Sequence, residues 1–166
     1  MKKCLIITYS RTGNTRKVAD SLYAKIESEN IFSGVDREII VENSKRKGLF
    51  GFVKSGYEAV AKKCPRIGPL KYNPDNYEVI ILATPTWAGT MASPIRAYIT
   101  IFRDILAEKP CFILSTTGDP EYKNTHLQFK DLLNHIPFTL SIPEKNILEN
   151  SFDDELNSFI SHLSLV

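Results

Sequence analysis

Six consecutive residues near the start of the chain carry a dense set of hydrogen-bond donors. They are Ser10, Arg11, Thr12, Gly13, Asn14 and Thr15. Hydroxyls beside the free N–H groups of a helix start favour an anion, and the helix dipole adds to this preference. Because the donors are mostly neutral, a phosphate monoester is the predicted ligand. The alternative is a loop whose Ser and Thr side chains only cap a helix.

The surrounding sequence indicates how this stretch is held. Residues 4–9 are an apolar run typical of a buried strand, and residues 14–29 show apolar positions at helical spacing. The stretch is therefore predicted to be a tight strand-to-helix turn. Gly13 is the residue there that allows a positive φ angle or a close backbone approach. The turn lacks the Gly-Lys-Ser/Thr ending of a P-loop and the Gly-x-Gly-x-x-Gly pattern of a dinucleotide fingerprint.

A second candidate segment follows the strongest predicted strand, residues 77–84. It contains Thr84, Pro85, Thr86, Trp87, Ala88 and Gly89. Pro85 stiffens the exit from the strand and Gly89 permits a tight turn. Trp87, the one tryptophan of the sequence, is placed to cover an aromatic ring of a ligand. The alternative is that Trp87 closes the end of the hydrophobic core.

A third candidate segment follows the predicted strand at 109–115. It contains Thr116, Thr117, Gly118, Asp119 and Tyr122. The first three can present backbone N–H groups to carbonyl oxygens of a ring. Asp119 is placed either beside the ring or as a cap of the next helix. Tyr122 is either a second ring cover or a core aromatic.

Strands and helices alternate along the whole chain. Strands are expected at residues 4–9, 39–41, 77–84, 109–115 and 138–142, and helices at 14–29, 49–63, 93–105, 122–135 and 153–165. This alternation predicts an α/β fold with a five-stranded parallel sheet in the order 2-1-3-4-5 and helices on both faces, a three-layer sandwich. We expect one domain over residues 1–166. In such sheets ligands bind at the carboxyl ends of the strands, where the three candidate segments lie.

Composition narrows the function classes. The chain has 166 residues, is 43% hydrophobic and carries a formal net charge of +2, which does not indicate a nucleic-acid partner. No apolar run is long enough to cross a membrane and no signal sequence is evident, so we expect a cytoplasmic protein. The three cysteines form no Cys-x-x-Cys pair, and no metal-ligand pattern is present. A monomer or weak dimer is expected.

The three segments together resemble a known family. Ser-x-Thr-Gly-Asn-Thr at residues 10–15 resembles the FMN-phosphate loop of flavodoxins, and Thr-Pro-x-Trp-x-Gly at 84–89 resembles their first ring loop. Thr-Thr-Gly at 116–118 resembles the second ring loop. The resemblance implies a flavodoxin-like fold and noncovalent FMN as cofactor. It implies that the first stretch holds the phosphate and that the other two flank the isoalloxazine, with Thr84 and Pro85 along the ribityl chain.

Two functions remain open. The main prediction is an electron carrier between redox partner proteins, in which the flavin does the chemistry and no side chain is catalytic. The alternative is an FMN-dependent NAD(P)H:quinone or small-molecule oxidoreductase. Electron-carrier flavodoxins are usually strongly acidic, and this chain is not. Arg11, Arg96 and the basic run at 45–47 offer contacts to an anionic nucleotide, or are ordinary surface charges.

Overall fold

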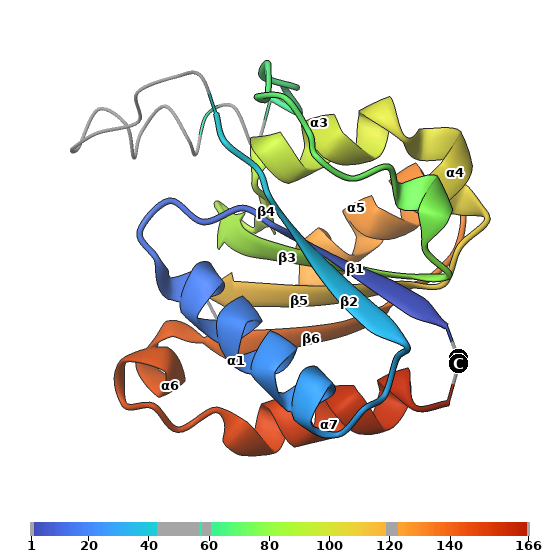
Figure 1. The fold of residues 1–166 in the computed structure, drawn as a ribbon. Coiled ribbons are helices and arrows are strands. Elements are labelled where there is room, and N and C mark those ends of the chain that lie inside the picture. Colours follow the sequence, from blue (N-terminus) through green and yellow to red (C-terminus); the bar gives the residue numbers. More distant parts are fainter. Residues whose placement is uncertain (1, 43–56, 58–60, 119–122, 166) are drawn as a thin grey trace.

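The computed structural model describes residues 2–42, 57, 61–118 and 123–165. Within them, parallel strands form one sheet in the order β2-β1-β3-β5-β6 (Figure 1). The strands are β1 (Lys3–Thr8), β2 (Gly34–Ile39), β3 (Val79–Trp87), β5 (Cys111–Thr117) and β6 (Phe138–Pro143). A short strand β4 (Thr90–Met91) pairs antiparallel with the end of β3. Counted without β4, this is the predicted order 2-1-3-4-5, so the predicted fold is confirmed.

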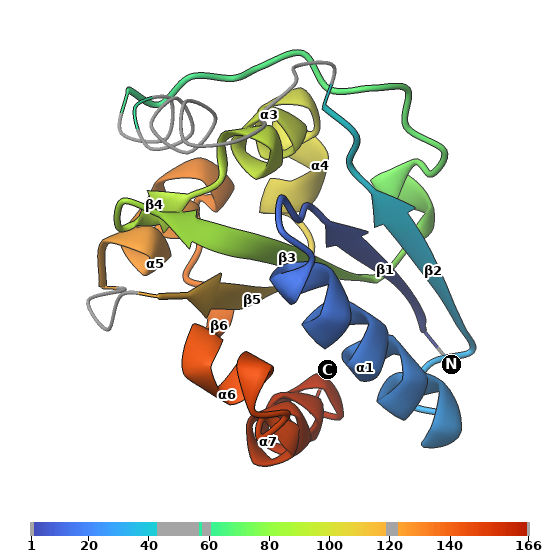
Figure 2. The same cartoon turned by 90° about the vertical axis from the view of Figure 1, so that its left-hand side faces the viewer.

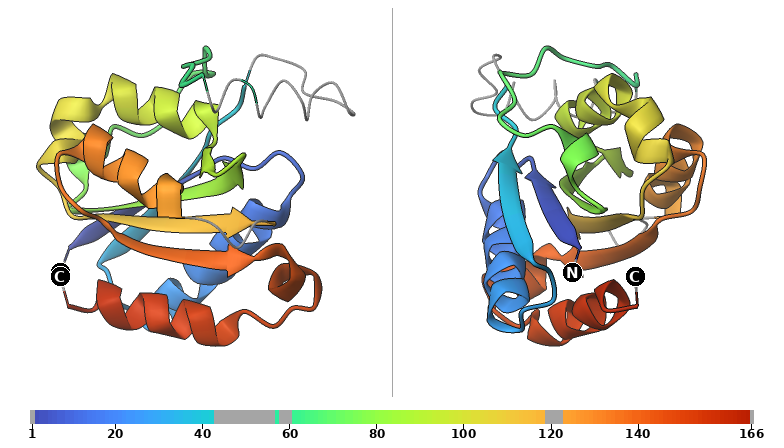
Figure 3. Two further views of the ribbon diagram at one scale, coloured as in Figure 1. Left: turned by 180° about the vertical axis from the view of Figure 1, so that it is seen from behind. Right: turned by 45° about the vertical axis from the view of Figure 1, so that its right-hand side comes forward.

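Helices cover both faces of the sheet (Figure 3). One face carries α1 (Asn14–Ser28), α6 (Glu144–Leu148) and α7 (Asp153–Leu163), and the other carries α3 (Ser93–Ile101), α4 (Arg103–Ala107) and α5 (Lys123–Leu133). A 3-10 turn, η1 (Pro74–Asn76), precedes β3.

The alternation of side chains along β1 shows how the two core layers form. Cys4 and Ile6 pack in the core beneath α1 and α7, whereas Leu5 and Ile7 pack in the core beneath α3 and α5. All four are fully buried. A strand covered on both faces must be apolar at consecutive positions, which explains the continuous apolar runs of the sequence.

The carboxyl ends of the central strands are in register. Thr8 of β1 lies beside Ala83 of β3, and Pro85 of β3 lies beside Thr116 of β5. The segments that follow these strands therefore leave the sheet at the same end. Figure 2 faces this end and shows the turn before α1, the β3–β4 hairpin and α6 gathered there.

Several local predictions are wrong. Strand β2 is Gly34–Ile39 rather than residues 39–41, because its pairing with β1 begins at Gly34, opposite Lys3. The strand predicted at residues 77–84 ends too early, since β3 continues to Trp87 and the chain returns as β4. The predicted helix at residues 93–105 is divided into α3 and α4, and Ala92, the residue before α3, makes no side-chain cap bond.

Two further elements bear on the predictions. Helix α6 was not predicted from the sequence. The predicted helix at residues 49–63 and the basic run at 45–47 lie almost entirely outside the described residues. Among the helices that the structure describes, none is long and apolar enough to cross a membrane.

The cysteines are unpaired thiols in two environments. Cys4 and Cys111 are buried in strands and Cys64 is exposed. Burial raises the pKa of the Cys4 thiol far above its ordinary value and raises that of Cys111 to about 12. The two buried thiols therefore act as small apolar side chains.

Candidate functional site

A cavity of about 350 Å³ opens at the carboxyl ends of β1, β3 and β5. Each of the three predicted segments contributes to its wall. Its lining consists of Arg11, Thr12, Asn14, Thr15, Pro85, Thr86, Trp87, Ala88, Thr116, Thr117, Gly118, Glu144 and Ile147. The volume lies in the range of small-ligand and cofactor sites. The structure thus brings the three predicted segments together, as the topology predicted, with Thr15 of the first and Thr116 of the third 101 positions apart in the sequence.

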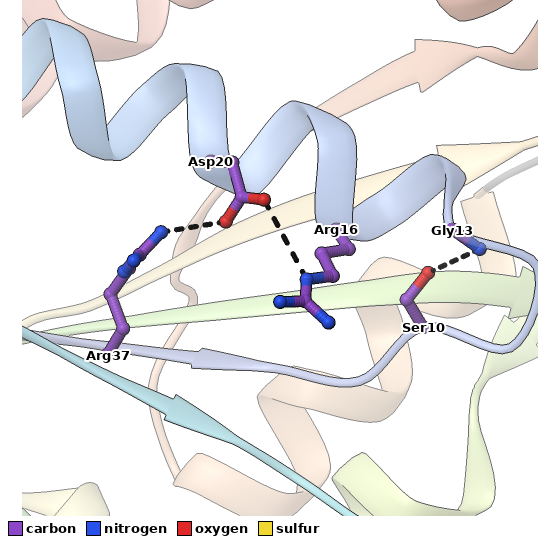
Figure 4. A network of polar contacts seen from close by, with 5 residues as sticks. All are labelled: Ser10, Gly13, Arg16, Asp20 and Arg37. Carbon is purple, nitrogen blue, oxygen red and sulfur yellow. Dashed lines mark hydrogen bonds and ion pairs between the residues drawn. The ribbon is translucent and has the colours of Figure 1, made fainter.

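The first turn is shaped by residues that do not themselves line the cavity. Gly13 adopts φ 103°, a conformation that L side chains rarely adopt. Its N–H donates to Ser10 Oγ at 3.1 Å, and Lys17 N–H donates to the Gly13 carbonyl at 2.9 Å. Ser10 therefore closes the turn internally (Figure 4). The positive φ predicted for Gly13 is confirmed.

The first turn of α1 contains no acidic residue. Arg16, which follows the turn, is directed along the helix toward Asp20, with Nε–Oδ2 at 3.8 Å (Figure 4). Asp20 also pairs with Arg37 of β2 at 2.8 Å. The cation that remains in the cavity wall from this stretch is Arg11, beside neutral Thr12, Asn14 and Thr15.

The first and third segments are joined by a buried pair of hydroxyls. Thr15 Oγ1 lies 2.7 Å from Thr116 Oγ1, and either oxygen can be the donor. Thr15 is 1% exposed and Thr116 is 5% exposed. A hydroxyl has one donor hydrogen and two acceptor sites. If Thr116 donates to Thr15, the hydrogen of Thr15 remains available for an anion in the turn.

The second segment is a tight hairpin. Its central residues, Ala88 and Gly89, have φ 47° and 70°, as two-residue hairpins of the primed type require. The Thr84 hydroxyl accepts from Ala92 N–H at 3.2 Å and is fully buried. Thr84 and Gly89 thus build the hairpin, and neither lines the cavity.

Trp87 belongs both to the core and to the cavity wall. Its side chain is 9% exposed and packs edge-on against the Tyr9 ring, with ring centroids 5.5 Å apart. The two alternatives posed by the sequence are therefore compatible, since the indole closes the core and lines the cavity. Packing against Tyr9 fixes the indole as a wall of the cavity.

The residue next to Trp87 carries a polar atom whose hydrogen-bonding capacity is unused. Thr86 Oγ1 is buried and has no hydrogen-bond partner. A buried hydroxyl without a partner costs about 1–3 kcal/mol. Because Thr86 lines the cavity, a polar group of a bound ligand can satisfy it, which fits a ring with carbonyl and N–H groups.

Sequence reasoning missed two residues of the site, both on α6. Glu144 Oε1 accepts from Asn14 Nδ2 at 2.7 Å, and Ile147 is buried in the wall. Lys17 Nζ donates to the Ile147 carbonyl at 2.9 Å, which holds α6 against α1. No local pattern marks these positions, because they reach the site only through the connection after β6.

Three other residues that were predicted to contact a ligand are not among the described residues of the cavity wall. Asp119 and Tyr122 lie outside the described residues. Arg96 is not a surface cation, because it is 4% exposed and donates through Nη2 to Gln128 Oε1 at 2.5 Å. Burial lowers the pKa of its guanidinium.

Solved structures share this fold over nearly the whole chain. A flavoprotein from Lactobacillus acidophilus in complex with FMN has a TM-score of 0.69 and 18% identity, covering 95% of this chain and 99% of its own. The NADH:FMN oxidoreductase EMOB in its apo form has a TM-score of 0.66 and 19% identity, covering 99% of this chain and 89% of its own. No curated protein sequence matches the chain.

A family model refines the resemblance found in the sequence. The model described as NADPH-dependent FMN reductase matches residues 1–153, a stretch that includes every described residue of the cavity wall. The flavodoxin-like fold is confirmed, while the match is to this family and not to flavodoxins proper. The chain belongs to the NADPH-dependent FMN reductase family.

Proposed function

We propose that the protein is an FMN-dependent NAD(P)H oxidoreductase acting on a small-molecule acceptor. The observation that carries the proposal is the family match over residues 1–153, joined to a cavity built by the three predicted segments. The family gives FMN as the flavin of the chain, as the sequence predicted. When bound, the flavin supplies the hydride and electron chemistry.

The donor set of the first turn suits the phosphate end of FMN. Thr12, Asn14 and Thr15 line the cavity with neutral donors, and Arg11 adds one positive charge. The N-terminus of α1 lies at the same turn, and its backbone N–H groups and dipole favour an anion. We therefore assign these four residues to phosphate binding, with Ser10 and Gly13 shaping the turn.

The remaining walls suit the flavin ring and its ribityl chain. Pro85, Thr86, Trp87 and Ala88 form one wall, and residues 116–118 form another. These walls orient the ring. Because Trp87 is fixed against Tyr9, it excludes water from one side of the ring. The buried Thr86 hydroxyl is the group best placed to accept or donate a hydrogen bond there.

The electron-carrier function that the sequence favoured has less support. The family match names a reductase that uses NADPH, and the net charge of +2 offers no strong field for steering a basic redox partner. We therefore place the small-molecule oxidoreductase first.

The decisive experiment mixes the flavin-loaded protein anaerobically with NADPH, and separately with NADH, while the flavin absorbance is followed. We expect bleaching of the flavin by at least one nucleotide and steady nucleotide oxidation once a quinone is added. A flavin-loaded protein that is reduced only by a separate reductase would instead establish a carrier. A protein that binds no FMN would refute both functions.

A second experiment tests the phosphate assignment. Thr12→Val removes one hydroxyl from the cavity wall, so it should weaken FMN binding while leaving riboflavin binding unchanged, because only FMN carries the phosphate. Equal weakening of both flavins would place the phosphate elsewhere.

A further inference from the structure

A carboxylate stands in the wall of a cavity assigned to an anion. Glu144 is the first residue of α6, and its Oε1 accepts from Asn14 Nδ2 at 2.7 Å. Its other oxygen, Oε2, lies 3.3 Å from the position that a Cβ on Gly118 would take. The carboxylate therefore sits between the turn before α1, to which it is hydrogen-bonded, and Gly118, which follows β5.

The Glu144 carboxylate changes the charge that the cavity wall presents to a phosphate. Among the described lining residues, Arg11 supplies the one positive charge and Glu144 the one negative charge. No described Lys or Arg forms an ion pair with Glu144. The described residues of the wall thus carry no net charge, while a phosphate carries up to two negative charges, and the repulsion from Glu144 offsets the attraction of Arg11.

Glu144 also occupies a donor that the phosphate needs. The Asn14 amide has two hydrogens, and one of them is committed to the carboxylate. An incoming phosphate must share Asn14 with Glu144 or displace it. Both effects act on the phosphate end of a flavin, and neither acts on a flavin without a phosphate.

On the basis of the function proposed above, we infer that Glu144 is a specificity-determining residue that weakens the hold of the first turn on the flavin phosphate. Its carboxylate lowers the preference for FMN over riboflavin and speeds FMN release. The protein thereby treats its flavin as an exchangeable ligand. Other residues of the turn supply the attraction that Glu144 opposes.

The test is Glu144→Gln, which removes the charge and keeps an oxygen that can accept from Asn14. Dissociation constants for FMN and riboflavin are measured by flavin fluorescence at low and high ionic strength, and FMN release is followed by stopped flow. We expect FMN to bind about three- to tenfold more tightly, the scale for removing one exposed charge near a phosphate. Riboflavin affinity should not change, and the FMN gain should shrink at high salt.

The matched control is Glu149→Gln. Glu149 follows the same short helix but pairs with Lys145 at 3.9 Å and does not line the cavity, so neither flavin should be affected. Glu144→Ala provides a second variant, with the same expected direction for FMN. FMN binding that is unchanged or weaker in both Glu144 variants, or tightened together with riboflavin, would overturn the inference while leaving the proposed function standing. Wild-type protein that binds neither flavin would overturn both.

Discussion

The hydroxyl pair between Thr15 and Thr116 gives the most direct test of how the site is assembled. Both side chains are buried, and their oxygens are 2.7 Å apart. Valine keeps the β-branched shape of threonine and removes only the hydroxyl. Each single substitution leaves the other hydroxyl buried without its partner, which costs about 1–2 kcal/mol of unfolding free energy. For a chain of this length that is a fall in Tm of roughly 2–8 °C.

The two substitutions should differ in their effect on FMN affinity. Thr15→Val also removes a donor to the phosphate, and a hydrogen bond to a charged group contributes about 1.5–3 kcal/mol, so FMN affinity should fall roughly 10- to 150-fold. Thr116→Val removes no phosphate donor, since the Thr15 hydrogen is still present. Riboflavin affinity should be similar in both variants.

The assays are denaturant unfolding and parallel titrations with FMN and riboflavin. The double variant should lose less stability than the sum of the two single variants, because two valines leave no orphaned hydroxyl. An FMN-selective loss in Thr116→Val as large as in Thr15→Val would show that Thr116, and not Thr15, faces the phosphate. Equal losses for FMN and riboflavin in Thr15→Val would remove the phosphate from this turn altogether.

Three further predictions follow from single positions. Gly13→Ala should destabilise the protein by about 1–2 kcal/mol through backbone strain at φ 103°, whereas Gly34→Ala, with open space and no positive φ, should change denaturant unfolding little. The pKa of Glu78 is lowered from its ordinary 4.5, chiefly by the hydrogen bond from Lys3 N–H. The wild type should therefore be more stable than Glu78→Gln at neutral pH and should lose that advantage as the pH falls below about 4.5. Denaturant unfolding of both proteins over a range of pH values measures this difference. Native protein should react rapidly with a thiol reagent only at Cys64, and Cys64→Ser should abolish this fast phase.

The order of the sheet was predictable because buried strands carry their signal locally. Residues 79–83 are apolar at consecutive positions and lie in the middle of the sheet, covered on both faces. The edge strand β2 is different, because it contains Asp36, Arg37 and Glu38 and pairs only with β1. Its apolar residues, Val35 and Ile39, are separated by three charged residues, which explains why the predicted strand began too late.

The part of the site that could be predicted is the turn at residues 10–15, because the end of one strand and the start of the next helix fix its backbone. The turn at residues 10–15 was identified from its own residues, and its Gly13 conformation was anticipated. The side chains within it were harder to assign, because Ser10 is turned toward Gly13 by a local bond. Residue type gives the capacity to donate or accept, while the partner depends on the folded backbone.

The parts that sequence could not give depend on long-range pairing. The extension of β3 through Pro85 relies on its register with Thr116 of β5, 31 positions later. Glu144 reaches Asn14 across 130 positions through a five-residue helix that has no periodic pattern of its own. Such contacts become visible only once the place of β6 in the sheet is known, because α6 follows β6 directly.

Both the net charge of the protein and the single charge of Glu144 help to distinguish an electron carrier from a reductase of small molecules. A protein that carries electrons to other proteins benefits from a strong surface field for steering, and from a flavin that stays bound through many encounters. This chain has a net charge of +2 and places Glu144 beside the turn assigned to the phosphate. A reductase of small molecules needs neither property, because its reactants diffuse freely and a loosely held flavin can itself leave in reduced form. The rate of flavin reduction by NADPH should therefore depend only weakly on ionic strength. FMN affinity of the wild type should also change little with added salt, because the Glu144 repulsion and the Arg11 attraction are screened together, whereas the FMN affinity of Glu144→Gln should fall. A steep salt dependence of reduction, or an FMN affinity of Glu144→Gln that does not change with salt, would contradict this assignment of charges.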